Sequence, residues 1–91
     1  MSDSPSPPES PIAALRRGDV DAFDAVYEQF HRRLYSFLAR MTGRRDAAED
    51  LSQELWMRFA KSAMRFGAET NVTTWLYTVA RNLAYSHRRW H

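Results

Sequence analysis

Aromatic and basic side chains recur at helical spacing near the end of the chain, in "TTWLYTVARNLAYSHRRW". Tyr77, Arg81 and Tyr85 are four residues apart, and the stretch contains no carboxylate. Residues four apart are neighbours on a helix, so two phenol rings flank one guanidinium. Such rings stack on unpaired bases for about 1–3 kcal/mol each, and arginines bind the phosphates. Asn82 adds an amide that can hydrogen-bond a base edge. The pattern therefore favours contact with a single-stranded nucleic acid.

The same residue types also occur at other kinds of interface. Exposed tyrosines and arginines anchor protein–protein contacts, so a helical interaction module that binds through Trp56, Met57 or the tyrosine line is one alternative. A second alternative is a reader of double-stranded DNA whose last helix enters a major groove, as in a helix-turn-helix protein. The connection "FGAETN" and the long helix before it do not resemble the usual short turn of that motif.

A second polar face is predicted on the preceding helix, within "RRDAAEDLSQELWMRFAKSAMRFG". Its members lie three and four residues apart, on the side away from the apolar stripe of that helix. That stripe is Ala47 or Ala48, Leu51, Leu55 and Phe59. The members of the polar face could form a solvated acidic first turn that the helix dipole favours. They could equally form a docking face for a basic partner. The face comprises Glu49, Asp50, Gln53, Glu54 and Met57.

Composition and charge fit one ordinary globular domain. The chain has 91 residues, of which 44% are hydrophobic and 26% charged, with a formal net charge of +2. Residues 1–30 hold six acids against two arginines, whereas residues 31–91 hold eleven basic residues against five acids. No acid follows Glu69. A basic stripe at the end of a domain indicates a polyanionic partner, although a solvated helix end has a similar composition.

Several classes of protein are disfavoured. The chain has no cysteine, so a disulfide framework and a thiolate metal site are excluded. We expect no membrane insertion and a cytoplasmic location, because no apolar run is long enough to span a bilayer and no signal peptide is evident. His87 and His91 have the spacing of two metal ligands but no evident third. We therefore expect no metal site, no cofactor and no enzyme activity.

Helix start and stop signals divide the chain into a tail and one helical domain. Residues 1–11 are rich in Ser and Pro and cannot bury enough apolar surface to offset their ordering entropy, so we expect disorder there. The domain then spans residues 12–91. Pro11 and Gly18 delimit a short first helix. The expected fold is all-α, a compact bundle of three main helices plus this short N-terminal helix.

The first two main helices have clear boundary residues. One begins at the N-cap Asp19 and ends at Gly43. The next begins with Asp46 and Glu49 in the spacing of a capping box and ends at Gly67. The apolar stripe of the first comprises Val20, Phe23, Val26, Tyr27, Phe30, Leu34, Phe37, Leu38 and Met41.

The last helix follows the loop "FGAETN", and either Thr70 or Asn71 can serve as its N-cap. Its inward stripe comprises Val72, Trp75, Leu76, Val79, Ala80 and Leu83. Its opposite face comprises Thr74, Tyr77, Thr78, Arg81, Asn82, Tyr85, Arg88 and Arg89.

The two motifs together resemble a known family. "DAAEDLSQELWMRF" followed by "TTWLYTVARNLAYSHRR" is similar to the paired signatures in the second conserved region of bacterial extracytoplasmic-function sigma factors. The resemblance covers about residues 12–90. In that family the domain is a helical bundle. Its first motif docks on the clamp helices of the largest catalytic subunit of RNA polymerase, and its second motif, with the loop before it, captures the melted minus-ten promoter element.

The resemblance implies a role for individual residues and for partners. Contact with the polymerase core is implied for Asp50, Gln53, Glu54 and Met57, which share a face with Glu49. Promoter DNA would contact the loop before the last helix and the polar positions on that helix. An anti-sigma protein is a further implied partner. A complete factor of the family also carries a second, helix-turn-helix domain, so an excised domain and a shortened relative both remain open. The implied promoter contacts are Asn71, Val72, Thr73, Thr74, Asn82, Arg88 and Arg89.

Overall fold

The computed structural model of the chain describes residues 11–90, and only the backbone of Trp90. The helices within this part, and a short 3-10 helix η1, are α1 (Pro11–Arg16), α2 (Val20–Thr42), α3 (Arg45–Ser62), η1 (Ala63–Arg65) and α4 (Val72–Trp90). The described residues contain no strand, and the predicted all-α fold is confirmed. The tail predicted to be disordered, apart from Pro11, lies outside the described residues.

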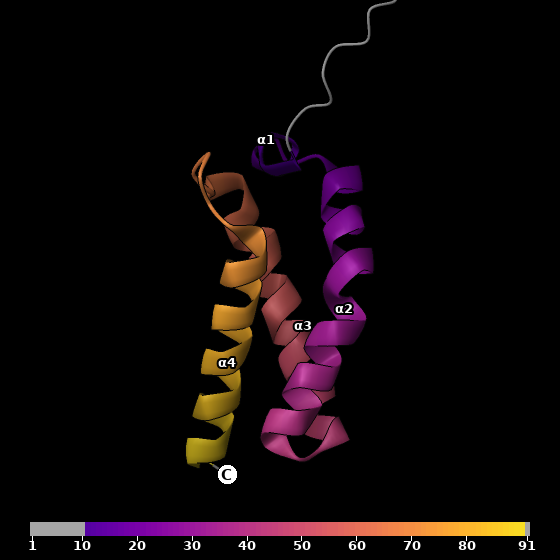
Figure 1. Ribbon diagram of the computed structural model, residues 1–91, viewed down its shortest axis with the longest axis vertical. Helices are drawn as coiled ribbons and strands as arrows, with labels where there is room; N and C mark the ends of the chain where they lie inside the picture. Colours follow the sequence, from indigo (N-terminus) through magenta and orange to yellow (C-terminus); the bar gives the residue numbers. More distant parts are fainter. Residues whose placement is uncertain (1–10, 91) are drawn as a thin grey trace, which may run out of the picture.

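The three long helices lie side by side, and α1 covers one end of the bundle (Figure 1). Helix α2 packs against both α3 and α4, while α1 packs against the start of α2 and against η1. Helices α2 and α4 run in the same direction, and α3 runs opposite to both (Figure 1). No helix in the described part of the chain is both long and apolar enough to cross a membrane.

Local sequence signals fix both ends of α2, as predicted. The Asp19 carboxylate accepts a hydrogen bond of 2.9 Å from the Asp21 backbone N–H, which satisfies one of the free donors at the helix start. Gly43 has a φ of 74°, and its N–H donates to the Ala39 carbonyl at 2.8 Å. Because this left-handed conformation is strained for residues with a Cβ atom, glycine is the favoured residue there.

The predicted capping box at the start of α3 is wrong. Arg44 occupies the N-cap position and makes no side-chain cap hydrogen bond. Asp46 lies inside the first turn, where its carboxylate accepts hydrogen bonds from the Arg44 guanidinium at 2.6 and 3.1 Å and from the Ala47 N–H at 2.8 Å. These hydrogen bonds hold the pKa of Asp46 below its usual range, and the Arg44 guanidinium has the largest effect. The side chain is therefore engaged locally and is not free to cap the helix.

The predicted end of α3 at Gly67 is also wrong. The α-helix ends at Ser62 and tightens into η1. Phe66 then adopts an extended conformation, with a φ of −62° and a ψ of 142°, and its side chain is buried. Burial of this ring requires the chain to leave the helix before Gly67, whose N–H instead donates to the Thr70 hydroxyl at 2.9 Å.

One fully buried aromatic ring joins the helices. Phe59 on α3 has no exposed surface, and its ring centroid lies 5.1 Å from Phe23 of α2 and 5.8 Å from Trp75 of α4. Phe66 and Trp56 pack on the same ring at 5.9 and 5.6 Å. The predicted apolar stripes supply most of the remaining core, and Leu15, Ala63 and Ala84 come from outside them. The buried residues around this cluster are Leu15, Val26, Phe30, Leu34, Leu38, Ala48, Leu55, Ala63, Leu76, Ala80, Leu83 and Ala84.

Replacing Phe59 by alanine should lower the free energy of unfolding by about 3–5 kcal/mol, because it removes a buried ring and leaves a cavity that neighbours fill only in part. Urea denaturation followed by circular dichroism measures this change. Met64→Ala is the control, since Met64 on η1 is 58% exposed. That substitution should change the same free energy by less than about 0.5 kcal/mol. Similar small losses in both variants would contradict the central position of Phe59.

Candidate functional site

Asn71 fixes the start of α4 and the loop before it. Its side-chain carbonyl accepts a hydrogen bond of 3.0 Å from the Thr74 N–H, and its backbone carbonyl accepts one of 2.9 Å from the Trp75 N–H. Asn71 is thus the N-cap, and Thr70 is not. The adjacent Val72 is half-buried and packs on the core, so of the four predicted loop contacts only Thr73 and Thr74 present wholly free side chains.

The polar positions in the second half of α4 are exposed and adjacent. Tyr85 is 54% exposed, and the arginines around it are also at the surface. Arg81 belongs to the same exposed face one turn earlier. No acidic residue occurs anywhere in α4. The side chains that line one shallow hollow here are Asn82, Tyr85, Ser86, Arg88 and Arg89.

Tyr77 was predicted to have an exposed ring, and this prediction is wrong in part. It is half-buried, packs against the core and makes an edge-to-face contact with Phe37 of α2, with 5.2 Å between ring centroids and 81° between ring planes. The cause is the packing of α4 on α2, which turns position 77 toward the groove between these helices. Tyr77 nevertheless lines an open hollow together with Thr73, Thr74 and Arg81.

The predicted polar face of α3 is present, but it is less acidic than expected. Glu49, Asp50 and Gln53 are exposed, and Met57 is 56% exposed. Glu54 is half-buried, and its carboxylate accepts a hydrogen bond of 2.8 Å from the Arg58 guanidinium. This ion pair partly neutralises the face.

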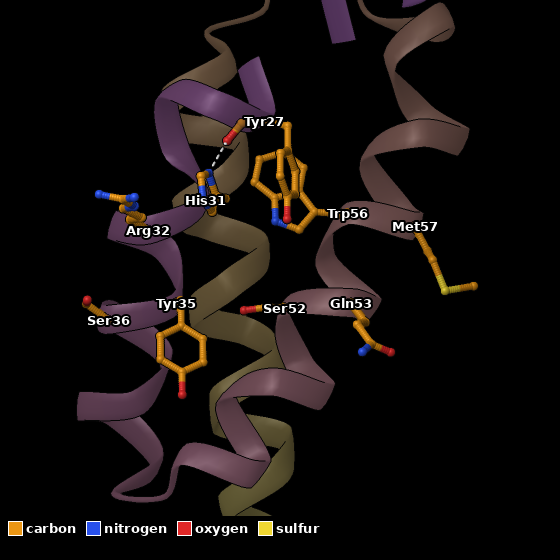
Figure 2. Close-up of a pocket in the computed structure, with 9 residues that line it drawn as sticks. All are labelled: Tyr27, His31, Arg32, Tyr35, Ser36, Ser52, Gln53, Trp56 and Met57. Carbon is orange, nitrogen blue, oxygen red and sulfur yellow. Dashed lines mark hydrogen bonds between the residues drawn. The ribbon is translucent and has the colours of Figure 1, made fainter. Parts of the chain in front are cut away.

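Gln53 and Met57 belong to a groove of about 730 Å³ between α2 and α3 (Figure 2). The α2 side of the groove is aromatic. Tyr27 stacks on His31 with 4.6 Å between ring centroids, and the ring of Trp56 from α3 lies 5.0 Å from Tyr27. His31 Nδ1 donates to the Tyr27 carbonyl at 2.9 Å, which fixes the imidazole against the helix (Figure 2).

Sequence reasoning missed the α2 side of this groove. It placed Tyr27 in the inward stripe, but Tyr27 is 38% exposed, and Val20 of the same stripe is also exposed. The available signal was the spacing of Tyr27, His31 and Tyr35, which are four residues apart like the aromatic line on α4. The buried hydroxyl of Ser52 also lines the groove and has no hydrogen-bond partner among the described residues.

No group of three or more His, Asp or Glu side chains within residues 11–90 is arranged to hold a metal ion. His91, the second member of the histidine pair, lies outside the described residues.

Comparison with known protein families gives a match that spans the three long helices. Residues 26–91 match the family described as Sigma-70 region 2. The match includes most of α2 and all of α3 and α4, and so contains both the α3 face and the α4 face.

Individual relatives are sigma factors of the extracytoplasmic-function type. The chain is 32% identical over 78 residues to SigW of Bacillus subtilis, covering 86% of this chain and 42% of that protein. It is 34% identical to BldN of Streptomyces coelicolor, covering 84% and 29% of the two chains. It is 40% identical to SigG of Mycobacterium tuberculosis, covering 74% of this chain and 17% of that protein. The chain belongs to the Sigma-70 region 2 family and is a region 2 domain of the extracytoplasmic-function type. It spans less than half the length of each of these relatives.

Replacing Asn71 by alanine should lower the free energy of unfolding by about 1 kcal/mol, because the Thr74 N–H loses its cap. Asn71→Asp keeps a side-chain oxygen at the same place and should retain most of the stability. Thermal denaturation of both variants measures the difference. Equal stability of Asn71→Ala and the unsubstituted chain would show that the side chain does not cap α4.

Proposed function

We propose that this domain acts in transcription initiation, binding RNA polymerase core through α3 and the unpaired non-template strand of the minus-ten promoter element through α4. One observation carries the proposal: a helix without any acid exposes Arg81, Asn82 and Tyr85 together, beside a separate acidic face on α3. Family membership supports the assignment of these two faces to the two partners.

The α3 partner is proposed to be the clamp helices of the largest polymerase subunit. Exposed Asp50 and Gln53 present hydrogen-bonding groups to a basic helix, and Met57 offers a flexible apolar contact at the mouth of the α2–α3 groove. A helix laid into a groove is a common recognition mode for such a surface. An anti-sigma protein, the further partner that the family resemblance implies, would act by covering either face.

The free energies show why the domain needs the polymerase. Opening roughly ten base-pair steps at about 1.4 kcal/mol each costs on the order of 14 kcal/mol. Two aromatic side chains that stack for about 1–3 kcal/mol each supply much less, and Tyr77 already packs against Phe37. In this proposal the domain traps a strand that the complete complex has opened, and it does not melt DNA alone.

The arrangement of α3 and α4 disfavours the helix-turn-helix alternative. In that motif two helices cross at about 90–120° and are joined by a turn of about 3–4 residues. Here residues 63–71 separate the helices and include η1. The two helices lie antiparallel, side by side (Figure 1). The structure therefore supports capture of a single strand better than insertion of α4 into a major groove.

Reversing two charges on α3 should weaken binding to polymerase core. We expect Asp50→Lys/Glu54→Lys to lose at least about tenfold in affinity, equivalent to about 1.4 kcal/mol, because like charges would meet at the junction. The fold should persist, since the Glu54–Arg58 pair, whose side chains are about half exposed, is an i,i+4 pair of the kind that contributes about 0.3–0.5 kcal/mol. Co-purification with core and biolayer interferometry measure the loss.

Asp24→Lys/Glu28→Lys is the matched control for that experiment. These two acids are also four residues apart and exposed, but they lie on α2 and do not line the groove. The control should bind core as the unsubstituted chain does. Equal weakening by the two double variants would mean that core binding responds to net charge and not to the α3 face.

Binding of the domain to single-stranded DNA should depend on salt. Arg81, Arg88 and Arg89 are exposed. If each neutralises one phosphate, the plot of log K against log salt should have a slope of about −2 or steeper. Filter binding over a salt series measures the slope, with the duplex of the same sequence as the comparison. A slope near zero, or tighter binding to the duplex, would contradict capture of an unpaired strand.

A further inference from the structure

A groove between α2 and α4 adjoins the α4 face. Tyr77 lines two hollows, one of about 270 Å³ beside α2 and one of about 400 Å³ beside the start of α4. The two hollows meet at Tyr77, which lines both, and Phe37, which contacts Tyr77, lines the second. The first hollow is lined by Arg32, Arg33, Ser36, Arg40 and Tyr77. The second is lined by Phe37, Thr73, Thr74, Tyr77, Thr78 and Arg81.

The charge of this groove is wholly positive. Helix α2 carries its acids before residue 29, and α4 carries none. Among the described residues, Arg33, Arg40 and Arg81 make no ion pair with a carboxylate. Arg33 is held in place, since its guanidinium lies 5.0 Å over the Phe30 ring and donates to the Gln29 carbonyl at 3.5 Å.

The spacing of Arg33 and Arg40 suits an extended anion. Seven residues place them on nearly the same side of α2, about 10 Å apart along the helix axis. Phe37 lies between them in sequence and contacts Tyr77. Two guanidinium groups at the border of an aromatic surface match the pattern that binds the backbone and bases of a single strand.

We propose that Arg33 and Arg40 of α2 bind backbone phosphates of the same unpaired DNA strand whose bases contact α4. The strand then crosses the α2–α4 groove over Phe37 and Tyr77. This inference rests on the proposed function and extends its DNA site to a second helix. The groove favours DNA over an acidic protein segment because it shares Tyr77 with the hollow lined by Thr73, Thr74 and Arg81, which already belong to the proposed strand site.

Two additional phosphate contacts have a measurable consequence. Each phosphate neutralised on a single strand contributes about −0.7 to the salt slope, so Arg33→Gln/Arg40→Gln should make the slope less steep by about 1.4. The probe is a fluorescein-labelled, mixed-sequence single strand of about 16 nucleotides, which is the upper end of the site sizes known for OB-fold proteins. Fluorescence anisotropy over a salt series gives the slope for the 91-residue chain.

Two matched variants separate this inference from the proposed function. Arg16→Gln/Arg65→Gln removes the same charge from exposed positions on α1 and η1 that line neither hollow, and should leave the slope unchanged. Arg88→Gln/Arg89→Gln removes two contacts from the α4 face itself and should also reduce the slope by about 1.4. If only the α4 variant differs from the control, the α2 contacts are overturned and the proposed function stands. If neither differs, the proposed function fails as well.

Nuclear magnetic resonance provides a test that needs no substitution. On titration with the same oligonucleotide, the side-chain Nε–Hε signals of Arg33 and Arg40 should shift together with that of Arg81. The signals of Arg16 and Arg65 should not move. Shifts of Arg81 without shifts of Arg33 and Arg40 would overturn the α2 contacts.

Discussion

Phe59 is the residue on which the geometry of both faces depends. Its ring is fully buried and contacts aromatic rings from α2, from the segment after η1 and from α4. Trp56, one turn earlier on α3, packs on Phe59 and on Tyr27, so the same cluster sets the width of the α2–α3 groove. Trp75 follows the N-cap of α4 and also packs on Phe59, so the cluster sets where α4 begins. One small core therefore positions two surfaces of different chemistry.

The two surfaces are complementary in charge to different partners. The α3 face carries exposed acids, and Glu54 is partly neutralised by Arg58. The α2–α4 side carries arginines without a carboxylate among the described residues. In the proposed function these surfaces belong to one rigid body, so a strand captured on α4 is placed at a fixed distance from the polymerase. Binding free energy from the protein junction then offsets the weak affinity of a few phosphate and stacking contacts.

Local sequence patterns predicted the helices and most of their caps, whereas tertiary packing decided the rest. The period of apolar residues located α2 and α4, and Asp19 and Gly43 marked the ends of α2 because capping involves only neighbouring residues. The end of α3 depended on burial of Phe66, a contact with other elements. Tyr77 was predicted to be exposed because a single helix does not show which neighbour covers it. For the same reason, no pattern within α2 alone indicates that its arginines border a groove with α4.

Photo-crosslinking shows which side chains lie against unpaired bases. A non-template strand that carries 5-iodouracil, bound to the domain together with polymerase core, reports which aromatic side chains contact unpaired bases. We expect crosslinks to Tyr85 and Tyr77 of α4, and none to the α2–α3 groove. Crosslinks confined to Tyr27 or Trp56, or crosslinks seen only with duplex DNA, would contradict strand capture by α4.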